Sequence, residues 1–229
     1  MKNYAFLLIL MVAVLFSSCT REDSDSVDQD TIHTRYVLEY NENSDVTYAR
    51  AQFRFGGSTG TILELAEDSE ISFNNEDMNW KPLFAYYELV FAGNVGTGVF
   101  GYTNDDGESF SNIAGVPEAI NFPSDLTVVN INNALSLEWE GASLESGEFC
   151  LITITGEDTT GDGELFIISD EGATDIVLPA DRLQEVGVGT ANMIINRDQN
   201  DFSINGTDEG GVVVGRYIGD RLNNIDFIQ

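Results

Sequence analysis

Alternation of apolar and polar side chains is the feature that most limits how this chain can fold. Ala49, Ala51 and Phe53 occupy alternate positions, with polar or basic residues between them. Successive side chains of a strand point to opposite faces of a sheet, so a period of two predicts a half-buried β-strand. Comparable runs follow at residues 61–65, 70–73, 86–91, 98–103, 135–139, 149–155, 164–168, 175–178, 192–196, 212–218 and 224–228. The sequence therefore predicts an all-β fold.

Turn-forming residues separate these runs. Segments 104–107 and 208–211 are rich in Asp, Asn and Gly, which is typical of hairpin connections. The one helical candidate is segment 179–187, in which Pro179 stands at the start and Gly187 at the end. A short helix is thus expected in an otherwise β-structured chain.

The pattern also indicates an internal duplication. Residues 51–57 align with residues 150–156, and further strands align with small gaps, although alternating strands also match each other by chance. Two of the four prolines lie close to the junction of the two halves. We predict two tandem immunoglobulin-like β-sandwich domains, residues 33–122 and 123–229, each near the ~100 residues typical of that fold. The alternative is one continuous sandwich of ~200 residues.

The start of the chain has the layout of an export signal. Lys2 precedes an uninterrupted apolar stretch, residues 4–16, and the small residues Ser17 and Ser18 follow it. A membrane-spanning helix needs ~20 apolar residues, so this stretch is too short to remain as one. We expect residues 1–18 to be a signal peptide that is removed.

The next residues resemble a known processing site. Leu15-Phe16-Ser17-Ser18-Cys19 is similar to the lipobox of bacterial lipoproteins, in which a signal peptidase cuts before a cysteine. Phe16 departs from the leucine that is commonest at its position. The resemblance implies that Cys19 carries diacylglycerol and fatty-acid chains such as palmitate, which would hold the protein on a membrane. An ordinary cleavage site with an incidental cysteine is the alternative.

A charged triplet follows the cysteine. Arg21, Glu22 and Asp23 resemble the surface-export signal of Bacteroidota lipoproteins, which implies a place on the outer face of the outer membrane. A charged linker without a sorting role is the alternative. Residues 19–32 contain few apolar side chains, so we expect a flexible, disordered acidic tether.

Two triplets within that expected tether resemble the O-glycosylation pattern of Bacteroidota. Asp25-Ser26-Val27 and Asp30-Thr31-Ile32 each place a hydroxyl between an acid and an aliphatic residue. Ser26 and Thr31 are therefore candidate acceptors, because a tether would leave both hydroxyls accessible.

Composition limits the partners. The chain has 39 acidic and 10 basic residues, a net charge of −29. Nucleic-acid binding needs a basic surface, so we exclude nucleic acid as a partner. The chain is nevertheless 42% hydrophobic and 10% aromatic, which indicates a folded protein. We interpret most of the carboxylates as solvated surface groups.

Two acidic turns are candidates for Ca²⁺ binding because they offer several carboxylate oxygens. Their residues are Asp105, Asp106 and Glu108 in the first turn, and Asp158, Asp162 and Glu164 in the second. Neither turn has the spacing of an EF-hand, and turns favour Asp for local reasons. We therefore expect no cofactor, with Ca²⁺ as the one candidate.

Residue types for catalysis are scarce. The only histidine is His33, and HExxH or Cys/His metal motifs are absent from the sequence. Cys150 alternates with Ile152 and Ile154, so we expect it to be buried as a small hydrophobe. Paired carboxylates for glycoside hydrolysis are available, but no pair is distinguished by an apolar setting.

Aromatic residues offer a binding function instead. Trp80 lies in the polar segment 74–82 and is the candidate for contact with a sugar ring, with burial in the core as the alternative. We predict a non-enzymatic cell-surface lipoprotein that acts in binding or adhesion, or as an accessory module of an envelope complex. Its expected partners are the outer membrane, through the lipid, and a glycan or an envelope protein. A carbohydrate-active enzyme is the alternative.

Overall fold

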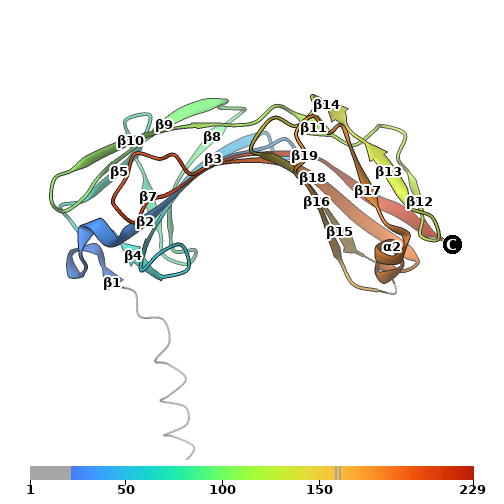
Figure 1. Ribbon diagram of the computed structural model, residues 1–229, viewed down its shortest axis with the longest axis horizontal. Coiled ribbons are helices and arrows are strands. Elements are labelled where there is room, and N and C mark those ends of the chain that lie inside the picture. Colours follow the sequence, from blue (N-terminus) through green and yellow to red (C-terminus); the bar gives the residue numbers. More distant parts are fainter. Residues whose placement is uncertain (1–21, 158, 160) are drawn as a thin grey trace, which may run out of the picture.

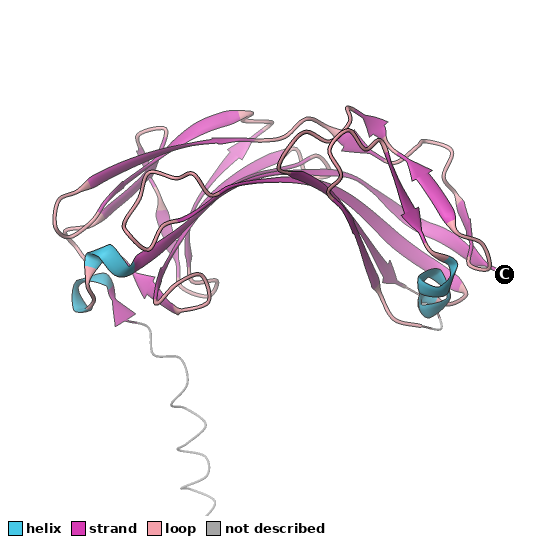
Figure 2. Ribbon diagram, in the orientation of Figure 1, coloured by secondary structure: helices cyan, strands magenta, loops and turns pink. Residues whose placement is uncertain are grey.

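The computed structural model describes residues 22–157, 159 and 161–229, and these form an arch built almost wholly of β-strands (Figure 1). The helical segments of the described residues are short and lie at the two ends of the arch (Figure 2): η1 (Ser24–Ser26), η2 (Gln29–Thr31) and α2 (Ala180–Val186). The predicted all-β class is confirmed. No helix in the described part of the chain is long and apolar enough to span a membrane. The predicted signal peptide and Cys19 lie outside the described residues.

One sheet runs through the whole arch, and in the described residues it has 11 strands. Its main path, in spatial order, is β1 (Glu22–Asp23), β4 (Thr61–Glu64), β3 (Val46–Phe55), β2 (Ile32–Asn41), β19 (Gly211–Ile228), β18 (Gly189–Asp201), β15 (Glu148–Gly156) and β16 (Glu164–Ile168). Beside this path lie β12 (Val128–Asn130) on β19, β8 (Tyr86–Ala92) on β3, and β7 (Asn79–Lys81) on β8. At ~3.3 Å per residue, the 18 residues of β19 extend about 60 Å, so this strand connects the two lobes.

A second, discontinuous layer covers the outer side of this long sheet. Over the first lobe it is a four-stranded sheet of β10 (Ser109–Gly115), β9 (Thr97–Thr103), β5 (Glu70–Phe73) and β6 (Glu76–Asp77). Over the second lobe it consists of two pairs, β11 (Ile120–Asn121) with β14 (Glu140–Gly141) and β13 (Leu135–Glu138) with β17 (Asp175–Leu178). The inner, concave side of the arch is therefore the uncovered face of the long sheet (Figure 1).

Each lobe has its own hydrophobic core between the two layers. The first core contains aromatic residues such as Tyr36, Phe53 and Phe100, with Tyr36 and Phe100 stacked at 5.0 Å between ring centroids. The second core contains Trp139 and Cys150. Cys150 is fully buried, as predicted, and burial raises the pKa of its thiol to about 12.

The two cores do not correspond to two consecutive segments of the chain. β19 pairs in parallel with β2, with Val213 opposite Tyr36, so a strand from the end of the chain completes the first lobe. Val213 packs in the first core, whereas Tyr40 and Phe122 pack in the second. The predicted boundary between residues 122 and 123 therefore does not divide the structure, because the long sheet is shared by both lobes. This arrangement is nearer to the continuous sandwich.

The two lobes do share one local arrangement. In the first lobe, the β3–β4 hairpin of the long sheet is followed by β5 in the outer layer. In the second lobe, the β15–β16 hairpin is likewise followed by β17 in the outer layer. These are the strands that the sequence aligned with each other.

The predicted tether is folded over its described part. Glu22 and Asp23 form β1, which pairs in parallel with Leu63 and Glu64 of β4. Ser24 is fully buried, and its carbonyl oxygen accepts a 2.7 Å hydrogen bond from the side-chain amide nitrogen of Gln29. The prediction of a disordered tether over residues 19–32 is thus wrong from residue 22 onward. Short polar side chains there bind backbone groups, which orders a segment that has little apolar surface.

Glycines allow the chain to cross over β19 at the middle of the arch, between the two lobes, which we call the waist. The connection from β10 to β11 runs over β19 on the outer side (Figure 1). A Cβ atom added to Gly215 would lie 1.9 Å from the carbonyl oxygen of Gly115, and one added to Gly219 would lie 2.1 Å from that of Ile120. Real Cβ atoms do not approach oxygen so closely, so the crossing requires glycine at both positions.

A buried ion pair lies in the second lobe. Arg197 is 1% exposed and pairs with Glu148, which is 4% exposed. The guanidinium also donates to the carbonyl oxygens of Ala142 and Ser143, at 3.1 and 2.7 Å. All three guanidinium nitrogens therefore have partners, as burial of a charge requires.

Candidate functional site

Trp80, the predicted sugar contact, belongs to the first core. It lies in β7 opposite Tyr87, and the two ring centroids are 4.9 Å apart. The indole is partly buried and packs against the core residues. The structure thus favours the core alternative over an exposed contact.

The first acidic turn is held by hydrogen bonds within the turn and to the loop before β5. Asp105 accepts from the hydroxyl of Ser69 at 2.5 Å, and Glu108 accepts from the side-chain amide of Asn104 at 3.1 Å. Asp106 lies with Asp105 in the lining of an acidic hollow beside η1 and η2. These interactions are those of a hydrogen-bonded turn.

The second acidic turn is only partly described, because Asp158 lies outside the described residues. Asp162 is exposed, and Glu164 forms an ion pair with Arg182 of α2. Within the described part of the chain, no group of three His, Cys, Asp or Glu side chains is placed to hold a metal ion.

The candidate glycosylation residues lie in ordered turns. The exposed Ser26 ends η1, and its hydroxyl donates to the carbonyl oxygen of Asp23 at 2.7 Å. Thr31 ends η2, and its hydroxyl donates to the carbonyl oxygen of Asp28 at 2.5 Å. Their modification stays a prediction.

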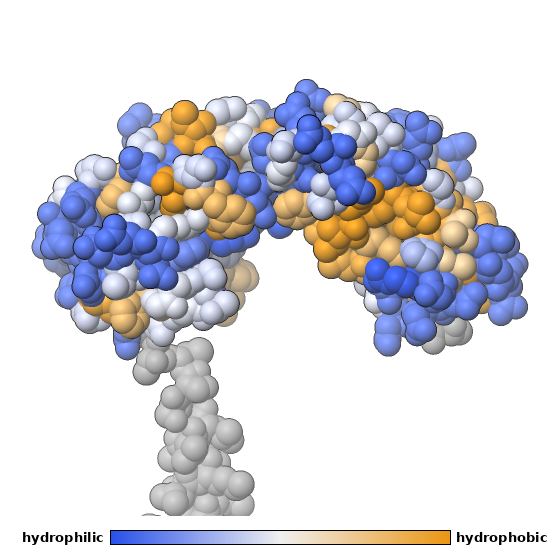
Figure 3. All heavy atoms as spheres, viewed as in Figure 1, coloured by the Kyte–Doolittle hydropathy of each residue, from blue (hydrophilic) through white to orange (hydrophobic). Residues whose placement is uncertain are grey.

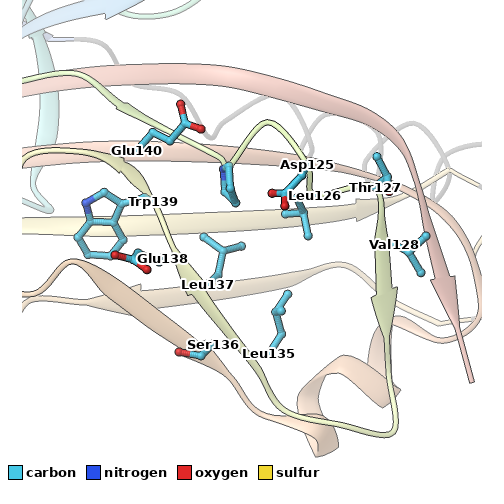
Figure 4. Close-up of a pocket in the computed structure, with 11 residues that line it drawn as sticks. Asp125, Leu126, Thr127, Val128, Leu135, Ser136, Leu137, Glu138, Trp139 and Glu140 are labelled. Atoms are coloured by element: carbon cyan, nitrogen blue, oxygen red, sulfur yellow. The ribbon is translucent and has the colours of Figure 1, made fainter.

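A hollow of about 710 Å³ lies on the outer side of the second lobe, between β12 and β13 (Figure 4). Leucine side chains and carboxylates line it: Leu126, Leu135, Leu137, Asp125, Glu138 and Glu140. Its lining contains no basic residue. It is therefore acidic like the rest of the surface, and it has no pair of opposite charges that could orient a ligand.

A smaller groove on the concave side differs in its chemistry. Its volume is about 160 Å³, and we call it the inner groove. It is lined by Arg35, Val37, Glu39, Arg50, Ala51, Gln52, Tyr86 and Arg216, from β2, β3, β8 and β19. β2, β3 and β8 are neighbours through their own pairing, and the pairing of β19 with β2 adds Arg216 from a distant part of the chain.

Charges alternate across the floor of the inner groove. Arg50 binds Glu88 at 2.8 Å and Glu39 at 3.0 Å. Arg216 continues the row by binding Glu39 at 3.3 Å and Asp198 at 2.8 Å. Each of these carboxylates is thus neutralised by an arginine. Hydrolysis by paired carboxylates, the predicted alternative, stays a prediction.

Three further cations lie on the same face of the sheet, on β2, β3 and β7, and we call them the basic corner: Arg35, Arg54 and Lys81. Arg54 donates to the side-chain oxygen of Gln52 at 3.0 Å, and Gln52 lies opposite Arg35 in the sheet. Lys81 lies opposite Tyr86. Among the described residues, no carboxylate lies within ion-pairing distance of any of the three cations. Together with Arg50 and Arg216, the basic corner thus accounts for five of the chain's ten basic residues.

Aromatic rings border the inner groove. The guanidinium of Arg50 lies 4.4 Å from the ring centroid of Tyr48 and 5.4 Å from that of Tyr86, which are cation–π distances. The ring of Phe84 stacks on Tyr86 with centroids 5.6 Å apart and planes 14° apart. Phe84 is 61% exposed and lies in the turn between β7 and β8. The groove thus has a flat apolar rim.

The concave side of the second lobe is apolar instead. Leu151 of β15 lies opposite Ile167 of β16, and Thr153 lies between Leu165 and Ile194. Leu165 and Ile167 are 44% and 57% exposed. Figure 3 shows hydrophobic residues gathered on the inner side of this lobe. The concave face therefore changes from basic and aromatic to aliphatic along its length.

The inner groove was not predicted from the sequence. The only signal was local: Arg50, Gln52 and Arg54 alternate with core residues on one strand, and Phe84 stands in a turn where polar residues are usual. Arg35 and Arg216 lie far apart in the chain, so nothing in the sequence joins them.

Comparisons with known proteins add little. The sequence matches no protein-family model, and no curated protein is similar to it at a significant level. One solved structure that the chain matches is described as an insight into host cell surface retention of a 1.5-MDa bacterial ice-binding adhesin. The two share 9% identity, with 88% of this chain and 67% of the other covered, and a TM-score of 0.24.

Proposed function

We propose that this protein is a non-enzymatic binding module that holds an extended glycan against the concave face of its arch. The observation that carries the proposal is the inner groove, where tyrosines and arginines gather on the uncovered face of the sheet. Aromatic rings offer large rigid surfaces for the apolar faces of sugar rings, and arginines donate several hydrogen bonds to sugar oxygens.

The rigidity of the groove supports this function. Arg50 and Arg216 are each fixed by two carboxylates, so their remaining donors are held in place before a ligand arrives. Arg50 also contacts two tyrosine rings. Preorganised side chains lose less conformational entropy on binding, which raises affinity.

Replacing Phe84 by Ala should weaken glycan binding about tenfold, because a stacking ring contributes on the order of 1 kcal/mol beyond its buried area. Phe84 is largely exposed, so the fold should not change. Affinity can be measured by calorimetry with glycans selected on an array.

Phe202→Ala is the matched control, because Phe202 is 73% exposed and, unlike Phe84, does not stack on a residue that lines the inner groove. Equal loss in both variants, or an unchanged affinity for Phe84→Ala, would place the glycan elsewhere.

The proposal includes a lipid anchor at Cys19 and display on the outer membrane. What supports it is the lipobox-like sequence, together with the charged triplet from Arg21 to Asp23. Three residue steps from Cys19 to Glu22 reach at most about 10 Å, so β1 would lie close to the lipid head groups. The lobe would then stand on the membrane without a long tether.

Cys19→Ala should abolish lipid attachment, because an alanine cannot form the thioether. Metabolic labelling with a fatty-acid analogue measures this directly. Cys150→Ala is the control and should keep its label, since that thiol is buried in the second core. Label that persists on the Cys19 variant would contradict the anchor.

A further inference from the structure

We propose that the ligand of the inner groove is an acidic glycan, and that Arg35 binds the carboxylate of a uronic acid unit. This inference rests on the proposed function and names its ligand class. It follows from the charge balance of the groove, from the placement of the aromatic rim, and from the geometry of the guanidinium group.

The first step concerns charge. The chain carries 39 acids, yet the basic corner has three cations without a carboxylate at ion-pairing distance among the described residues. Arg35 is exposed, and among the described residues it has no hydrogen bond or ion pair. Partial burial of the guanidinium and the positive charge of Arg216 both lower the pKa of Arg35. An anion at this position would supply the missing counter-charge.

The second step concerns the shape of the ligand. Tyr86 lines the same groove as Arg35, and the ring of Phe84 stacks on Tyr86. A ligand that uses both needs an apolar ring face and an anionic group on one unit. At about 160 Å³, the groove is smaller than the pockets that enclose whole small molecules, so it suits one unit of a longer chain. A uronic acid within a glycan meets these conditions.

The third step separates a carboxylate from other anions. The planar guanidinium forms two parallel hydrogen bonds with the two oxygens of a carboxylate. The acidic surface around the groove would repel a densely charged polymer, but at physiological salt this repulsion is screened beyond about 8 Å. One carboxylate per sugar unit is therefore better tolerated than several sulfate groups.

The test uses defined tetramers of galacturonic, glucuronic, mannuronic and guluronic acid. Each is paired with its methyl ester, which removes the charge and leaves the sugar ring unchanged. We expect at least one acid to bind about tenfold more tightly than its ester in calorimetry at 150 mM salt, as a charged hydrogen-bonded pair implies. Arg35→Gln should reduce the affinity for the acid to that for the ester, without changing the affinity for the ester.

Arg221→Gln is the matched control, because it removes the same charge from an exposed arginine outside the inner groove. The affinity of Arg35→Lys for the acid should lie between those of wild type and Arg35→Gln, since lysine keeps the charge and loses the second hydrogen bond. Circular dichroism checks that all variants are folded.

The remaining outcomes separate the two proposals. Equal binding of acid and ester would overturn the acidic ligand and leave the glycan face standing. Equal binding of a tetramer built from neutral sugar units and carrying sulfate groups would overturn the choice of a carboxylate over other anions. A preference for the acid that Arg35→Gln does not change would place the carboxylate elsewhere and overturn the role of Arg35. If no tetramer binds, the acidic ligand is overturned, and the array-selected glycans with Phe84→Ala test the glycan face independently.

Discussion

Arg197→Met is expected to lower the free energy of unfolding by about 3–5 kcal/mol, because it leaves Glu148 as an uncompensated buried charge. It also removes the hydrogen bonds that Arg197 donates to the carbonyl oxygens of Ala142 and Ser143, and among the described residues only Ala142 keeps another donor, the indole N–H of Trp139. A domain of this size has a total stability of about 5–15 kcal/mol, so the variant should be folded but much weakened.

Urea denaturation followed by tryptophan fluorescence measures this loss. Trp139 lies in the second core and donates to Ala142, so it reports on the affected region, whereas Trp80 reports on the first lobe. Arg221→Met is the control for loss of an arginine at an exposed position. Adding Glu148→Leu to the variant should recover stability, because no buried charge is left unpaired. A loss below about 1 kcal/mol, typical of an exposed pair, would contradict the burial.

Gly215→Ala is expected to destabilise the protein by about 3 kcal/mol or more, at the upper end of the range for overpacked sites. The new methyl group would lie 1.9 Å from the carbonyl oxygen of Gly115, and this atom belongs to backbone that cannot rotate away. The connection between the lobes would have to lift off β19. Thermal unfolding should therefore begin at the waist of the arch.

Gly96→Ala serves as the control, because a Cβ atom at Gly96 meets no other atom within 4 Å. Differential scanning calorimetry of both variants measures the loss, and a control melting close to wild type is expected. Hydrogen exchange of the β19 amides would show where the opening occurs. If Gly215→Ala had the same melting temperature as Gly96→Ala, the two chain segments would not cross as closely as described.

Local elements of the fold could be predicted because their causes are local. The run at 86–91 corresponds to β8, and the expected helix is α2, with Leu183 and Val186 fully buried. The runs at 212–218 and 224–228 are parts of one strand, β19. The alternation predicted two strands here because the residues between the two runs are mostly polar or glycine, and alternation can be recognised only where apolar residues recur.

Pairing of distant strands could not be predicted, and it decides both the architecture and the candidate site. Alternation assigns Arg35 and Gln52 to the polar faces of two neighbouring strands, but it does not say which strand lies on the other side of β2. That strand is β19, which brings Arg216 beside Glu39. The buried Arg197 was likewise missed, because its partner Glu148 lies on another strand. The exposure of Phe84 could not be predicted either, because this residue lies in a turn, where the alternation of apolar and polar residues does not apply.

The parallel pairing of β2 with β19 also determines when the protein can fold. Val213 enters a core whose other buried members begin with Ile32, so this core stays open until synthesis has reached Val213. Contacts between such distant residues slow folding, because a long loop must close before they form. Until then β2 keeps an unpaired edge, which is a site for aggregation. Because β19 contributes to both cores, the order of synthesis holds both lobes open until this strand is present.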